Sequence, residues 1–100
     1  ARMHPIPELP AIRRDLALLA PVSVNHRDIL KILTTEGKTL LEDCFLFDVY
    51  RGKGIPEDSR SLAYAMTFRD AKKTLTDEEI QPMISRMVER LEKELAVKLR

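Results

Sequence analysis

The chain has 100 residues, of which 44% are hydrophobic and 33% charged, and 17 Lys and Arg against 16 Asp and Glu leave a net charge of +1. This composition is typical of one soluble domain with a single core, and it disfavours fibrous and disordered classes. The near-zero net charge also argues against a general polyanion binder. No apolar run approaches the roughly 20 residues that a bilayer crossing requires, and the N-terminus lacks a signal-peptide core, so we expect no membrane partner.

The N-terminal segment indicates a connection to a longer protein. The chain begins with Ala1 rather than Met, so we expect a fragment whose parent can hold a catalytic centre elsewhere. Three prolines at positions 5, 7 and 10 restrain their predecessors to extended conformations, which predicts an extended linker over residues 1–12. The domain itself is predicted over residues 13–100. The lone Cys44 cannot form an internal disulfide, which fits a reducing compartment and other places too.

The first half of the domain predicts a strand and a helix. Residues 13–20 are short, apolar toward their end and bounded by Pro10 and Pro21, which favours a strand. Asn25 can cap a helix with Asp28 in its first turn, and Gly37 is expected to end it. The apolar face of that helix is formed by Ile29, Leu30, Ile32 and Leu33.

The second half predicts a hairpin, a long helix and an edge strand. Residues 40–50 are rich in aromatic and β-branched side chains from Phe45 onward, and residues 52–59 contain two glycines and a proline, so they indicate a strand and a turn. Residues 60–69 alternate with period two, as in a strand. Thr76 and Glu79 have capping-box spacing before a helical apolar repeat that reaches Leu95, although Pro82 favours a kink or a later start. Residues 96–100 are short enough for an edge strand.

The predicted order βαββαβ defines the fold class as α+β. It indicates a ferredoxin-like plait, with a four-stranded antiparallel sheet and two helices on one face. The other face of the sheet would be open to solvent or to a ligand.

Strand alternation predicts which side chains lie on that open face. In the third strand the large residues Leu62, Tyr64, Met66 and Phe68 are expected to face the helices, and the alternate small and polar residues are expected to line the open face. In the second strand Phe45, Phe47 and Val49 are expected in the core, which leaves Leu46, Asp48 and Tyr50 open. In the first strand Leu16 and Leu18 point inward, and Asp15, Ala17 and Leu19 outward. A β-bulge would invert this assignment.

Such an open face would be a flat platform of small side chains. It could accept a nucleobase stacked on Tyr50 and a phosphate near Arg69. Small side chains equally fit a packed contact with another domain of the parent chain.

The residue types for metal or nucleophilic chemistry are sparse. His4, His26 and Cys44 are too few and too irregularly spaced for a zinc site, so no metal site is expected. A serine or cysteine nucleophile would have only His26 as a base within the predicted domain. The segment Gly52-Lys53-Gly54 lacks the frame of a phosphate-binding loop and precedes a strand, so it predicts a hairpin loop. The sequence therefore favours a binding domain with no catalytic residues.

Four motifs together resemble a known family. PAIRRDLALL (residues 10–19), FDVYRGKGIPE (47–57), SLAYAMTFRD (61–70) and TLTDEE (74–79) resemble the ferredoxin-fold anticodon-binding domain at the C-terminus of bacterial-type phenylalanyl-tRNA synthetase beta subunits. The likeness runs over nearly the whole chain. Family members often have proline after the FRD segment, where this chain has Ala71.

The resemblance implies a function and a set of partners. The parent would attach phenylalanine to its tRNA in the cytoplasm with ATP and magnesium, at an active site in the alpha subunit, and this fragment would need no cofactor of its own. Its partners would be phenylalanine tRNA and, through the parent beta chain, the alpha subunit.

The resemblance also implies roles for particular residues. Tyr50 would stack on the first anticodon base, Asp48 would accept a hydrogen bond from the edge of that base, and Ser61 and Ala17 would lie near the same nucleotide. The RNA backbone would be positioned by Arg51, Lys53, Arg60 and Arg69, an assignment that rests on charge.

Other readings of the sequence remain. An amino-acid-sensing regulatory domain usually has glycines between its first strand and first helix, where this chain has Pro21-Val22-Ser23-Val24. A conventional RNA-recognition motif would place aromatic residues on the open face of the third strand, whereas Tyr64 and Phe68 have core parity. A structural docking domain that touches no RNA is the main alternative, since a docking face can also be flat and small.

Overall fold

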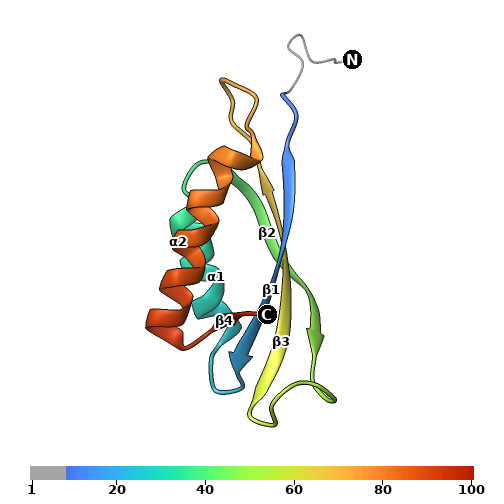
Figure 1. Cartoon of the computed structure of the whole chain (residues 1–100). Coiled ribbons are helices and arrows are strands. Elements are labelled where there is room, and N and C mark those ends of the chain that lie inside the picture. Colours follow the sequence, from blue (N-terminus) through green and yellow to red (C-terminus); the bar gives the residue numbers. More distant parts are fainter. Residues whose placement is uncertain (1–8) are drawn as a thin grey trace.

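The computed structural model describes residues 9–100, which form a sheet with both helices on one of its faces (Figure 1). The elements in chain order are β1 (Ile12–Pro21), α1 (His26–Gly37), β2 (Leu41–Tyr50), β3 (Ser59–Phe68), α2 (Asp77–Leu95) and β4 (Lys98–Leu99). The four strands lie in the order β2-β3-β1-β4, and every neighbouring pair is antiparallel. This is the predicted ferredoxin-like α+β fold.

The ends of the chain differ in detail from the predicted bounds. β1 begins one residue earlier than expected, and residues 1–8 of the expected linker lie outside the described residues. β4 has only two of the five residues expected for it, because Ala96 takes the left-handed conformation with φ 57° as it ends α2. The described residues contain no helix long and apolar enough to span a bilayer.

The predicted caps define where the helices begin. The Asn25 side chain accepts a hydrogen bond from the Arg27 amide at 2.8 Å, and Thr76 and Glu79 form a complete capping box. α2 begins directly after Thr76 and contains Pro82, so the later start that this proline suggested is wrong. Each cap satisfies backbone N–H groups that the first helical turn leaves unpaired.

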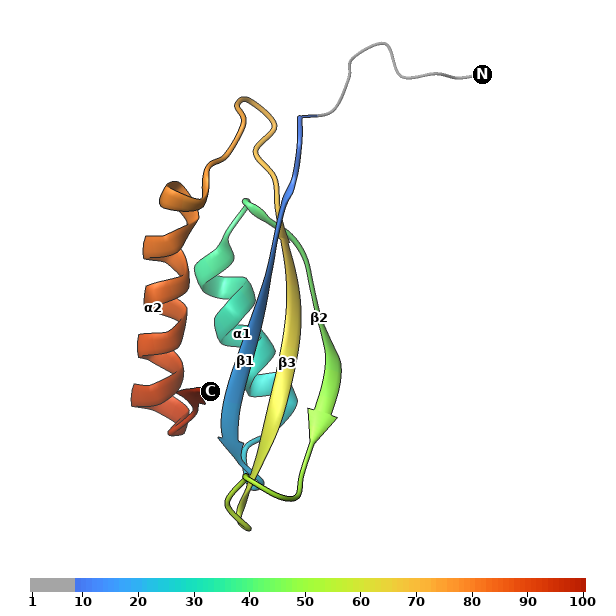
Figure 2. The ribbon, with the colours of Figure 1, turned by 45° about the vertical axis from the view of Figure 1, so that its right-hand side comes forward.

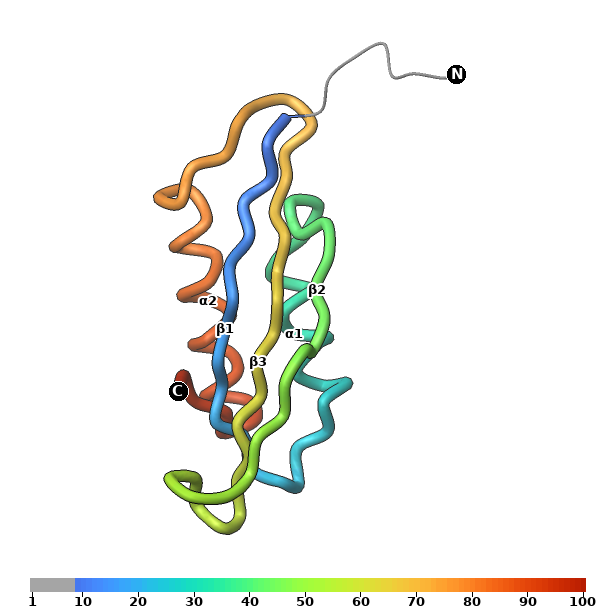
Figure 3. Tube along the Cα trace, turned by 90° about the vertical axis from the view of Figure 1, so that its right-hand side faces the viewer, coloured from blue at the N-terminus to red at the C-terminus, as the bar shows by residue number. Residues whose placement is uncertain are grey.

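The core lies between the sheet and the two helices. The large residues of β3, Leu62, Tyr64, Met66 and Phe68, are fully buried on this side, as predicted. The helices contribute Ile29, Leu33, Ile80, Met87 and Leu91, which are also fully buried. In Figure 3 both helices lie behind the strands, and no other element of residues 9–100 covers the opposite face; Figure 2 shows α2 beside the sheet and α1 behind it. The chain therefore has its own core and one bare sheet face.

The side-chain directions predicted for β2 are wrong over its first half. Phe45 opposes Ala65 and therefore lies on the open face, whereas Leu46 opposes the buried Tyr64 and packs against the core. The pairing then shifts by one residue, so that Asp48 opposes Ala63 and Phe47 is the extra residue of a β-bulge.

The bulge restores the predicted directions in the second half of β2. Asp48 and Tyr50 lie on the open face, and Val49 opposes Leu62 on the helix side. Val49 remains 50% exposed there, so it is not the core residue that the sequence predicted. Uninterrupted alternation thus fails for Phe45, Leu46 and Phe47 because the chain gains one residue relative to β3.

Gly37 is the last residue of α1, and close packing, not its backbone conformation, requires a glycine there. A Cβ atom at this position would lie 2.5 Å from the Cβ of Leu41, and the positive φ of 52° belongs to the next residue, Lys38. The turn into β2 therefore depends on a glycine that has no room for a side chain.

We expect Gly37→Ala to lower the free energy of unfolding by about 1–3 kcal/mol, because the added methyl forces α1 and β2 apart. Urea unfolding followed by circular dichroism measures the change. Lys38→Gly is the matched comparison, since glycine tolerates a positive φ better than lysine, and it should leave stability unchanged or raise it. An equal loss from both variants would show that the turn is sensitive to any substitution and not to the methyl.

Candidate functional site

The open face consists of rows of cross-strand neighbours from β2, β3 and β1. One row contains Asp48, Ala63 and Ala17, and the next contains Tyr50, Ser61 and Leu19. Opposed residues in antiparallel strands point to the same side of the sheet. The structure thus brings the four predicted base-contacting residues, Ala17, Asp48, Tyr50 and Ser61, into two adjacent rows.

The Tyr50 ring is held by the loop that follows it. Its hydroxyl donates a hydrogen bond to the carbonyl of Lys53 at 3.1 Å, and 41% of the residue is exposed. Gly52 has φ 137°, a conformation that favours glycine, and a Cβ there would meet the Tyr50 hydroxyl oxygen at 3.4 Å. The loop therefore fixes the direction of an exposed aromatic ring.

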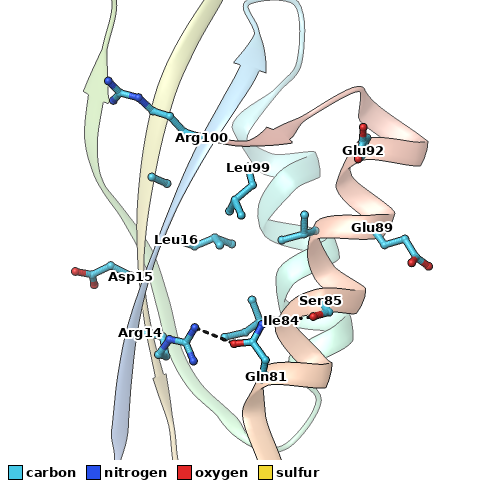
Figure 4. Close-up of a pocket in the computed structure, with 12 residues that line it drawn as sticks. Arg14, Asp15, Leu16, Gln81, Ile84, Ser85, Glu89, Glu92, Leu99 and Arg100 are labelled. Atoms are coloured by element: carbon cyan, nitrogen blue, oxygen red, sulfur yellow. Dashed lines mark hydrogen bonds between the residues drawn. The ribbon is translucent and has the colours of Figure 1, made fainter. Parts of the chain in front are cut away.

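Arg100 also belongs to this site, although no sequence pattern pointed to it. Its amide donates to the Ala17 carbonyl at 2.9 Å, its Nη1 donates to the Ser61 hydroxyl at 2.9 Å, and its Cζ lies over the Tyr50 ring at 6.0 Å from the centroid. Figure 4 shows its side chain running from the end of β4 across the sheet. One residue thus contacts three of the four predicted site residues.

The pairing of β4 with β1, and not a local sequence motif, places Arg100 in the site. Leu99 pairs with Leu18, which places the next residue beside Ala17. Ser61 is only 5% exposed, and its hydroxyl accepts the bond from Arg100. A ligand reaches this hydroxyl only if the Arg100 side chain moves, whereas Asp48 is already exposed.

The four predicted phosphate contacts do not form one cluster. Arg51 and Lys53 are exposed in the loop next to Tyr50, and the Arg51 guanidinium donates to the Glu57 carbonyl at 3.3 Å. Arg60 opposes the buried Ala20, so its side chain lies on the helix side of the sheet and not on the open face. Its Nη2 donates to the Val24 carbonyl at 2.8 Å.

Arg69 lies far from the Tyr50 ring. It follows the opposite end of β3, where it forms an ion pair with Glu42 at 3.0 Å and donates to the Leu9 carbonyl. Of the four predicted phosphate contacts, only Arg51 and Lys53 therefore lie beside the rows that contain the predicted base contacts.

Of the groups singled out for metal or nucleophilic chemistry, His26 and Cys44 lie on the helix side of the sheet, and His4 lies outside the described residues. Cys44 opposes Met66, and burial, with a smaller contribution from the Asp43 carboxylate, raises the pKa of its thiol to about 11. The His26 Nδ1 lies 2.7 Å from the hydroxyl of the buried Tyr64. Within residues 9–100, no three His, Cys, Asp or Glu side chains are placed to hold a metal ion.

Cysteine reactivity can test the side-chain directions in β2. Only the thiolate is alkylated, so a pKa near 11 should slow the reaction of Cys44 with iodoacetamide at pH 8 by about 10- to 100-fold relative to the urea-unfolded chain. In Cys44→Ser/Phe45→Cys the new thiol lies on the open face and should react near the unfolded rate. Equally slow reaction of both thiols would contradict the register described for β2.

The same pKa has a consequence for stability. Above the pKa of the unfolded thiol, near 8.5, unfolding releases a proton that the folded chain retains. The contribution of Cys44 to stability is therefore complete below that pH and is lost as the pH rises toward 11.

Two comparisons relate the sequence of this chain to known proteins. A family described as "Ferredoxin-fold anticodon binding domain" matches residues 7–100. Among curated relatives, the phenylalanine–tRNA ligase beta subunit of Listeria monocytogenes is 41% identical over 92 residues, which are 92% of this chain and 12% of that protein. The beta subunit of Thermotoga maritima is 38% identical over 97% of this chain and 12% of its own length. The chain thus spans about an eighth of the relatives that it matches.

Proposed function

Because this chain belongs to the family of ferredoxin-fold anticodon-binding domains, we propose that it binds the anticodon stem-loop of phenylalanine tRNA on the open face of its sheet. The observation that carries the proposal is the exposed Tyr50 ring, whose hydroxyl is held by the Lys53 carbonyl, in the row next to the Asp48 carboxylate. An aromatic face stacks on an unpaired base, and a carboxylate accepts hydrogen bonds from the N–H groups of a base edge. Ser61 and Ala17 would form the floor beneath the same nucleotide.

Arg100 leaves nearly enough room for a base above Tyr50. A base between the ring and the guanidinium needs about 6.8 Å, twice the stacking distance of about 3.4 Å, and the guanidinium carbon lies 6.0 Å from the ring centroid. A small displacement of Arg100 would therefore admit the base and release the Ser61 hydroxyl. A stacked base would then have an aromatic ring on one side and a cation on the other.

The chain would act as part of a larger enzyme. We propose that the parent is a phenylalanine–tRNA ligase beta subunit that works in the cytoplasm with an alpha subunit. ATP and magnesium would be used at an active site in that alpha subunit.

Tyr50→Ala is the direct test of this proposal. We expect it to weaken binding of an anticodon stem-loop RNA by about 1–3 kcal/mol, the usual contribution of stacking one base, with the fold unchanged by circular dichroism. Tyr50→Phe keeps the ring and loses only the bond to Lys53, so it should retain most of the affinity. Fluorescence anisotropy with labelled RNA measures both variants. Unchanged affinity in Tyr50→Ala would overturn the proposal and favour a docking role.

The salt dependence of binding tests the phosphate contacts. Lys53→Ala should reduce the slope of log affinity against log salt by about one, because one fewer counterion is released. Lys31→Ala is the matched control, since Lys31 is exposed on α1, away from the open face, and its slope should equal that of the unmodified chain. Equal slopes for both variants would remove Lys53 from the interface.

A further inference from the structure

Phe45 is a second exposed aromatic residue on the open face. It opposes Ala65 on β3, which in turn opposes Asp15 on β1, so these three residues form one row of the face. Phe45 is 47% exposed, close to the 41% of Tyr50. Its chain neighbours Cys44 and Leu46 pack against the core on the other side of β2. The Phe45 ring is therefore directed away from the core.

The surroundings of Phe45 repeat those of Tyr50. Each aromatic residue stands on the edge strand β2 and opposes a small residue of β3, Ala65 in one row and Ser61 in the other. The row between them contains the exposed carboxylate of Asp48. A single exposed hydrophobic side chain is ordinary on a protein surface. Here, however, an aromatic ring beside a small neighbour occurs twice on one face, with the Asp48 carboxylate in the row between the two rings.

We propose that Phe45 stacks on a second unpaired nucleobase of the same RNA loop, an inference that rests on the function proposed above. Ala65 and Ser61 are four residues apart on β3, which corresponds to about 13 Å along the strand. Stacked bases are only about 3.4 Å apart, so the two rings cannot contact one base or two directly stacked bases. The RNA loop presents two splayed bases, one to each ring.

The charges around Phe45 favour contact with a base over contact with phosphate. Asp48 lies in the neighbouring row and Asp15 at the far end of the Phe45 row, and both are exposed. Carboxylates repel phosphate but accept hydrogen bonds from base amino and imino groups. The second site therefore takes a base with an N–H donor on its edge, with its phosphates directed away from the sheet.

The test compares two variants of Phe45 with a control from the same strand. Phe45→Ala should weaken binding of the anticodon stem-loop RNA about 5- to 150-fold, and Phe45→Leu should recover only part of that loss because it restores apolar area without an aromatic face. Val49→Ala removes a side chain of similar exposure from the helix side of β2 and should leave the affinity unchanged. Anisotropy titrations with the unmodified chain measure all three.

A direct observation of stacking comes from the ring protons of Phe45, which should shift upfield in the NMR spectrum when the RNA binds. If Tyr50→Ala weakens binding and Phe45→Ala does not, the second site is wrong and the proposed function stands. If neither variant changes the affinity, the proposed function itself is wrong. A loss in Val49→Ala as large as that in Phe45→Ala would place RNA on the other side of β2 and overturn the inference.

Discussion

The pairing of β2 with β3, including the bulge at Phe47, is the constraint on which the open face depends. β3 lies between β1 and β2 and pairs with both along its length. The extra residue Phe47 allows Phe45 and Tyr50 to lie on the same face although they are five positions apart. In a regular strand two residues separated by an odd number point to opposite faces. Without the bulge, Phe45 and Tyr50 would lie on opposite faces of the sheet.

The core explains why these rings come from the edge strand. Tyr64 and Phe68 of the central strand β3 are fully buried against the helices. The residues of β3 that alternate with these core residues lie on the open face. They are all small: Ser61, Ala63, Ala65 and Thr67. The aromatic side chains of that face, Phe45 and Tyr50, therefore come from the edge strand β2. The outcome is a flat floor with aromatic rings along one side, which suits bases that leave their own stack.

Arg100 connects the aromatic ring on the edge strand β2 with the small residues of β3 and β1. Arg100 contacts Ala17 through its backbone and Ser61 and Tyr50 through its guanidinium. The short strand β4 directs it there, since the Leu18 and Leu99 pair sets the position of the residue that follows. Ala96, which has a positive φ, ends α2 and turns the chain toward β4. The position of the Arg100 guanidinium over the site therefore depends on how α2 ends.

Much of the fold and part of the site followed from local patterns in the sequence. Asn25 and Thr76 cap their helices because a cap needs only its own first turn, and period two in β3 identified its buried face because that strand is regular. Alternation also placed four predicted site residues on one face: Ala17 in β1, Asp48 and Tyr50 in the second half of β2, and Ser61 in β3. The direction of Phe45, the position of Arg100 and the separation of Arg60 from the site depend on pairing between distant segments. No local period encodes an inserted residue or a contact across the sheet, so only the assembled fold determines them.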